Sequence, residues 1–165
     1  MTRHFNSLGA FALHLVELEV GIAESLHLGL ERVAKHIEKT AKAEFGVYQN
    51  EQGSFPAWPE LADSTKDDRA RLGYTENDPL LRSGELRDTI GHEVHGLEAV
   101  IGSTDEKMVF HEFGTSKMPA RPVLGPAAFT SKSAIEKLVG AALVAGLIGK
   151  DQIHPALGYD FVTKE

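Results

Sequence analysis

Histidine and carboxylate side chains offer the widest chemistry in this sequence, and their spacing limits what they can do. The run His92-Glu93-Val94-His95 has the residue types of a zinc-protease helix, but that motif places two residues between the glutamate and the second histidine. Here the histidines stand three apart in a segment with strand periodicity, so they would point to opposite faces. We therefore expect no metal site and no cofactor, and interpret the eight histidines as surface and interface residues.

Two further groups of residues have the residue types of a phosphate-binding or catalytic site but not the spacing that such a site requires. The run from Gly114 to Lys117 lacks the glycine spacing and the lysine-serine order of a phosphate-binding loop. Ser103 and Asp105 with His111 supply the residue types of a hydrolase triad, but no Gly-x-Ser-x-Gly elbow is present. The sequence therefore predicts a protein that is not an enzyme.

Composition narrows the class of partner. The chain has 165 residues, no cysteine and a formal net charge of −7. The absence of cysteine excludes disulfides and thiolate sites, and fits assembly in a reducing cytoplasm. The charge argues against a general nucleic-acid binder; it either serves solubility or lets DNA pass without specific binding. No run approaches the ~18–20 apolar residues of a membrane helix, so we expect no membrane partner.

Apolar residues recur every three or four positions near the N-terminus, which predicts one long amphipathic helix. Asn6 or Ser7 can cap its start, and Gly46 can end it. A helix of ~35 residues spans roughly 50 Å, longer than a domain of this size needs for its own core. Part of the stripe is therefore expected to meet a neighbouring subunit. The stripe consists of Leu8, Phe11, Leu15, Leu18, Ile22, Leu26, Leu30, Val33, Ile37, Ala41 and Phe45.

The rest of the chain reads as shorter elements. Residues 63–72 and 80–90 favour short helices, and residues 90–101 alternate around His95-Gly96 like an antiparallel hairpin. Residues 108–113 fit a strand or a helical turn, residues 114–125 an irregular proline-rich loop. A last helix is expected from about Pro126 to about Ile148.

These elements predict an α+β fold, with a long N-terminal helix and a C-terminal helix packed on a small antiparallel sheet. We expect residues 1–149 to form one domain. Residues 150–165 would be a C-terminal tail whose apolar content suggests that it docks on a partner or folds back on its own domain.

Three stretches, taken in order, carry a recognisable set of motifs. Residues 80–90 follow a leucine-leucine-arginine, small residue, glycine pattern, and residues 101–103 form the strand end that comes after it. Residues 111–127 are the most specific, with glutamate-phenylalanine-glycine-threonine and then proline-alanine-arginine-proline. Together these stretches resemble the small morphogenesis proteins of tailed bacteriophages, and Trp58, followed by proline, resembles a segment of the related virion-morphogenesis group.

The resemblance, carried mainly by residues 80–127, implies a tail-completion or neck protein, often a hexameric ring between the head connector and the tail tube. Two departures weaken the subfamily assignment. Residues 108–111 stand where the family commonly has a tyrosine-alanine pair, and Val123 and Gly125 stand where it often has phenylalanine and arginine.

The proline-rich loop is the expected subunit interface. Its prolines fix the backbone, so the loop loses little entropy on binding. Arg121 is held where it could form a bidentate pair with a carboxylate, for which Glu112 is a candidate within the subunit or across the ring. Alternatively, the loop only covers the sheet edge and guides the chain into the last helix. The predicted interface residues are Glu112, Phe113, Gly114, Thr115, Met118, Pro119, Arg121 and Pro122.

Three interpretations of function follow. The first is a structural subunit made in the host cytoplasm and placed at the virion neck, where a homo-oligomeric ring joins the tail to the head connector. The second is another minor tail or stopper component of the same particle. The third, from a different class, is a hydrolase or metal-binding protein that uses His92, His95 or His111.

Overall fold

The computed structural model describes residues 4–148. It contains six helices and one two-stranded antiparallel sheet in these residues, which confirms the α+β class. Contacts divide the described chain into two compact units, each treated separately below. We call residues 4–33, 94–99 and 134–148 the terminal unit, and residues 34–93 and 100–133 the central unit. The expectation of one domain over residues 1–149 stays a prediction, and the tail expected over residues 150–165 lies outside the described residues.

Helix α1, Leu8–Ala43, is the long helix that the apolar stripe predicts, and it contributes to both units. The Ser7 hydroxyl accepts a hydrogen bond from the backbone N–H of Ala10 at 3.1 Å, as an N-terminal cap does. Beyond the other end, Gly46 adopts a φ of 86°, the left-handed conformation that turns the chain away from the helix axis.

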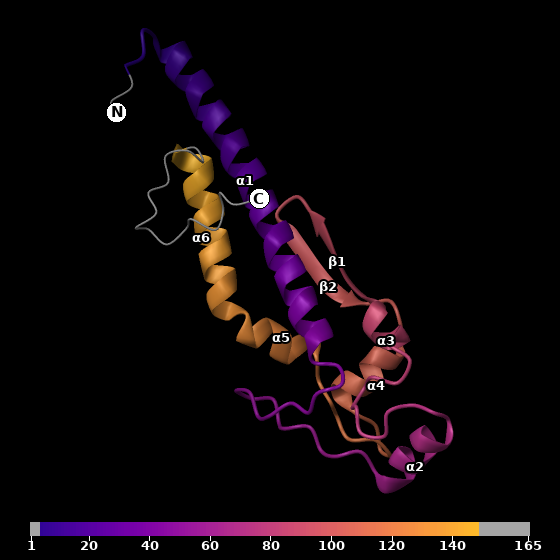
Figure 1. Ribbon diagram of the computed structural model, residues 1–165. Helices are drawn as coiled ribbons and strands as arrows, with labels where there is room; N and C mark the ends of the chain where they lie inside the picture. Colours follow the sequence, from indigo (N-terminus) through magenta and orange to yellow (C-terminus); the bar gives the residue numbers. More distant parts are fainter. Residues whose placement is uncertain (1–3, 149–165) are drawn as a thin grey trace. The chain divides into compact units, whose positions relative to one another are not determined.

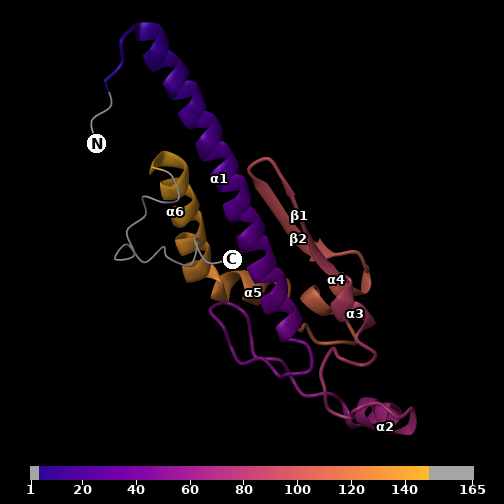
Figure 2. The ribbon, with the colours of Figure 1, turned by 45° about the horizontal axis from the view of Figure 1, so that its top comes forward.

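In the terminal unit, helix α6, Lys132–Ile148, runs beside α1 (Figures 1 and 2). Small residues bring the two helices close together. A Cβ built on Gly29 would lie 2.5 Å from the Cβ of Ala142, and one built on Gly146 would lie 2.6 Å from the Cα of Ile22. The helices can therefore pack this closely only because Gly29 and Gly146 have no Cβ atom. In the same unit, the His27 ring bonds the carbonyl of Gly96 in the hairpin turn.

In the central unit, strands β1, Ile90–His95, and β2, Glu98–Ser103, pair as the alternation predicts. Helix α3, Glu85–Asp88, precedes the hairpin and helix α4, Lys107–Phe113, follows it, so both lie at its open end (Figure 1). Helix α2, Asp63–Arg71, lies between two loops. The core of this unit contains Ile37, Ala41, Phe45, Trp58, Ile90, Met108, Val123 and Ala127.

The structure corrects two expectations. Residues 80–90, expected as one broken helical segment or two short helices, form only the single turn of α3, because Leu80 has a φ of 59° and Gly84 one of 90°, which keep the residues before Glu85 out of a helix. The last helix is two helices: α5, Leu124–Thr130, and α6, separated at the buried Ser131. The segment of residues 108–113, left open between strand and helical turn, is the helix α4.

Candidate functional site

The proline-rich loop and its surroundings form the most constrained part of the central unit. At its start, Gly114 has a φ of 73°, and an added Cβ would lie 2.8 Å from the backbone nitrogen of Ala120. Thr115 and Met118 exchange two backbone hydrogen bonds, and the N–H of Arg121 donates to the carbonyl of His111 at 2.7 Å. The loop is therefore folded tightly on itself, as its glycine and prolines require.

Trp58 and Arg121 attach this loop to the segment after α1. The indole Nε1 of Trp58 donates to the carbonyl of Pro122 at 3.0 Å inside the core. The Arg121 guanidinium donates twice to the carbonyl of Pro59, at 2.8 and 3.2 Å, and once to that of Glu60 at 3.1 Å. Both side chains are about nineteen-twentieths buried, so this connection is part of the core.

The expected pair between Arg121 and Glu112 does not form within the chain. The Glu112 carboxylate instead accepts the backbone N–H groups of Val123, Leu124 and Gly125, at 2.8, 3.2 and 3.0 Å. The first N–H groups of a helix have no partner inside it, and here α5 begins at Leu124. The Glu112 carboxylate therefore caps the start of α5, whereas the Arg121 guanidinium donates to the backbone carbonyls of Pro59 and Glu60.

The buried carboxyl of Glu44 lies near Glu112. Glu44 is 6% exposed, and its Oε2 has no hydrogen-bond partner among the described residues. Burial, with a smaller contribution from the charge of Glu112, raises the pKa of Glu44 to about 8. Glu44 therefore carries a proton at neutral pH.

The loop borders a pocket of about 630 Å³ in the central unit. Arg69 and Arg121 contribute to its lining, although each is about nineteen-twentieths buried. The Nη1 group of Arg69 donates to the carbonyls of Asp78 and Leu81, at 2.7 and 3.1 Å, and at 3.4 Å to that of Thr75. Burial is the main reason why the pKa of Arg121 is lowered, and the nearby charge of Arg69 adds to it.

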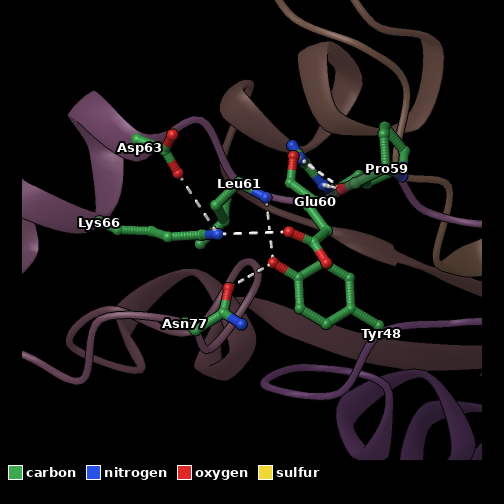
Figure 3. A network of polar contacts seen from close by, with 8 residues as sticks. Tyr48, Pro59, Glu60, Leu61, Asp63, Lys66 and Asn77 are labelled. Atoms are coloured by element: carbon green, nitrogen blue, oxygen red, sulfur yellow. Dashed lines mark hydrogen bonds and ion pairs between the residues drawn. The ribbon is translucent and has the colours of Figure 1, made fainter.

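Beside the pocket, a polar network fixes the segment between α1 and α2 (Figure 3). The Tyr48 hydroxyl donates to Asn77 Oδ1 at 2.6 Å and accepts the N–H of Leu61 at 3.0 Å. Lys66 points to the carboxylate of Glu60, 3.3 Å away. The network therefore fixes Glu60 and Leu61, which line the pocket, and the Arg121 guanidinium bonds the backbone carbonyl of the same Glu60.

The eight predicted interface residues divide into two groups. Glu112, Arg121 and Pro122 make contacts inside the chain, and Gly114 and Met118 are half-buried. Phe113, Thr115 and Pro119 face outward, and the Phe113 side chain is 79% exposed. This second group contains the predicted interface residues whose side chains are exposed on the outer surface. Their role as an interface stays a prediction.

The structure also shows residues that the sequence reasoning missed. Arg69 carries no motif, since its burial arises only when the loop after α2 folds over it. Glu44 comes directly after α1, where a charged residue is usually exposed to solvent, so nothing in the sequence indicates its burial. Val109 and Phe110 lie exposed on α4 with Phe113, which makes an apolar patch that the expected strand or helical turn did not define.

The histidine hypotheses gain no support from the geometry. His92 bonds Glu38 of α1, and His111 lies in α4 with its Nδ1 buried and without a hydrogen-bond partner among the described residues. Ser103 bonds the hydroxyl of Thr89 at 2.7 Å. No group of three or more potential metal ligands occurs in residues 4–148. No helix in that part of the chain is long and apolar enough to cross a membrane.

Comparison with known proteins finds two relatives in Haemophilus influenzae. Mu-like prophage FluMu G protein 1 is 32% identical over 95 residues, which cover 57% of this chain and 64% of that protein, just under two thirds of its length. Mu-like prophage FluMu G protein 2 is 29% identical over 126 residues, which cover 67% of this chain and 83% of that protein. No family model matches the sequence, and no solved structure matches it. The similarities confirm the coarser part of the sequence-based assignment: this is a phage-related protein, similar to G proteins of Mu-like prophages.

Proposed function

We propose that this chain is a structural subunit of a tailed-phage particle, a tail-completion or neck protein whose copies close a ring at the head–tail junction. Its similarity to Mu-like prophage proteins supports the phage context. The observation that carries the proposal is the exposed N-terminal part of α1, which presents apolar side chains on two separate faces.

The first face continues the apolar stripe of α1. It consists of Leu8, Phe11, Leu15 and Leu18, and three of these side chains are exposed to 40% or more. We call this set seam A. In a soluble protein, apolar side chains in such a row mark an interaction surface.

The second face lies across the helix. It consists of Leu13, Val16 and Val20, which are 62%, 55% and 51% exposed, and we call it seam B. With 3.6 residues per turn, the two seams are centred about 150° apart around the helix axis. Glu17 and Glu19 separate them on either side.

Two seams on one helix require two neighbours. If seam A of each subunit packs against seam B of the next, the contact is between unlike surfaces and repeats around a closed ring. A contact of one seam with itself would instead give a dimer and leave the other seam exposed. The two-seam arrangement therefore favours a repeating assembly of unlike contacts over a dimer, and we propose that it closes as a ring of six copies.

The patch of Val109, Phe110 and Phe113 on α4 gives the ring a further contact surface. We propose that such exposed side chains meet the head connector or the tail tube. The acidic balance of the chain lets DNA pass through the ring without specific binding, because like charges repel. No catalytic step is needed for this role.

Head–tail joining in the test tube tests the proposal. Purified protein is mixed with tails and DNA-filled heads that lack it, and joined particles are counted by electron microscopy. Wild-type protein should restore joining, and Leu15→Glu in seam A or Val16→Lys in seam B should each abolish it. Ala10→Glu, on the polar side between the seams, is the matched control and should restore joining.

Mixing the two defective variants distinguishes a ring of unlike contacts from other modes of assembly. In an alternating ring, the glutamate introduced in seam A of one variant meets the lysine introduced in seam B of its neighbour, and the remaining contact is wild type. An equimolar mixture should therefore restore joining although each variant fails alone. No joining by wild-type protein, and no binding to heads or tails, would refute the neck assignment.

A further inference from the structure

The pocket bordered by the proline-rich loop contains two buried positive charges without an ion partner. Arg69 and Arg121 are 6% and 5% exposed, and no carboxylate lies within ion-pair distance of either in residues 4–148. Buried charges in proteins are usually paired, because transfer of an unpaired charge out of water is unfavourable. A pocket of about 630 Å³ bordered by two such groups is therefore unusual.

The hydrogen bonds of these arginines leave donors for a ligand. Arg69 uses only its Nη1 group, and Arg121 uses Nε and Nη2, so three of their six guanidinium nitrogens have no acceptor in the described chain. Carbonyl partners orient the guanidinium groups but carry no negative charge. His111 also lines the pocket, and its buried Nδ1 has no partner among the described residues.

Three of the four acidic residues that line the pocket are engaged in ion pairs, and the fourth, Glu85, is exposed. Asp68 pairs with Arg71 at 2.6 Å, Glu60 with Lys66 at 3.3 Å, and Asp105 with Lys107 at 3.5 Å. These carboxylates do not neutralise the buried arginines. They do give the pocket entrance a negative component, which repels a polyanion such as nucleic acid more than it repels a single charge.

We propose that this pocket binds a carboxylate carried by a polypeptide segment of a partner protein. A guanidinium group matches a carboxylate in a planar, two-bond geometry. Apolar side chains of Leu61, Leu86 and Met118 in the same lining would contact the uncharged part of the segment. The inference goes beyond ring formation and does not depend on it, since it rests on the central unit alone.

Side-chain NMR of the full chain tests the pocket directly. The probe is a capped tripeptide, alanine-glutamate-alanine, and its glutamine counterpart is the uncharged control. We expect the glutamate peptide to shift the Nε–Hε signals of Arg69 and Arg121 in a saturable way, and the glutamine peptide to leave them unchanged. Inorganic phosphate is titrated separately at the same ionic strength.

A matched pair of variants on α2 identifies the site without altering either arginine. Thr65 lines the pocket and stands four residues before Arg69, so Thr65→Glu supplies a competing carboxylate from inside the chain. Ser64 is exposed, lies in the first turn of the same helix and does not line the pocket. Thr65→Glu should lower the affinity for the glutamate peptide about tenfold, because the new carboxylate competes for one charged hydrogen-bonded pair. Ser64→Glu should leave that affinity unchanged.

Three results would overturn the proposal. They are the absence of a saturable shift with the glutamate peptide, an equal loss of affinity in both variants, and tighter binding of phosphate than of the glutamate peptide. Failure of head–tail joining would leave this test unaffected, because the peptide titration uses the isolated chain.

Discussion

Replacing Glu44 with glutamine should remove most of the loss of stability that the wild-type protein suffers as the pH rises. Burial, assisted by the charge of Glu112, raises the pKa of Glu44 from 4.5 to about 8. The folded protein therefore holds a proton that the unfolded chain releases. The contribution of this proton to the free energy of unfolding is fully present below pH 4.5, falls as the pH rises toward 8 and is lost above it.

The magnitude follows from the size of the shift. Each pKa unit corresponds to ~1.4 kcal/mol, so the whole window from 4.5 to about 8 represents roughly 5 kcal/mol, of which roughly 3 is already lost near neutral pH. Glutamine keeps the shape of the side chain and never ionises. Glu44→Gln should therefore be more stable than wild type at pH 8, and the difference should shrink on acidification.

Urea unfolding at several pH values, followed by fluorescence of the single tryptophan, measures this difference. Trp58 is 5% exposed and reports on the same unit. Glu51→Gln, in an exposed loop, controls for the loss of one surface charge. Parallel pH profiles for wild type and Glu44→Gln would show that the Glu44 carboxyl is ionised in the folded protein and would refute the reasoning.

Two further predictions concern packing and the core hydrogen bond. Gly29→Ala should destabilise the terminal unit by about 1–3 kcal/mol in thermal unfolding, because the new Cβ would lie 2.5 Å from that of Ala142. In the control Gly9→Ala, the new Cβ meets only a hydroxyl at 3.8 Å, so this variant should instead stabilise the helix by about 0.5–1 kcal/mol. Equal effects of the two substitutions would contradict this account. Trp58→Phe should cost about 1–3 kcal/mol in urea unfolding, because it leaves the buried carbonyl of Pro122 without its donor, and an unchanged midpoint would show that another donor replaces it.

Sequence periodicity was sufficient where one local pattern determines the structure. The apolar stripe predicted α1, and alternation around His95-Gly96 predicted the hairpin, which forms with Gly96 at a φ of 59°. Each of these elements is encoded by neighbouring residues and by a turn that glycine adopts without strain. The proline-rich loop was also predicted correctly as far as residue 123, since Pro119 and Pro122 disfavour helix and sheet pairing, whereas α5 begins at Leu124 and contains Pro126 in its first turn.

The partners of charged side chains were decided by the tertiary structure. Arg121 and Glu112 are plausible partners by residue type, yet each satisfies backbone groups from a different part of the chain. Nothing near Arg69 or Glu44 in the sequence signals that either is buried. A hydrogen bond depends on which unpaired backbone groups the folded chain brings within about 3 Å, and sequence separation does not constrain that distance. The sequence by itself thus determined the elements, whereas only packing decided which charges are buried and what they bind.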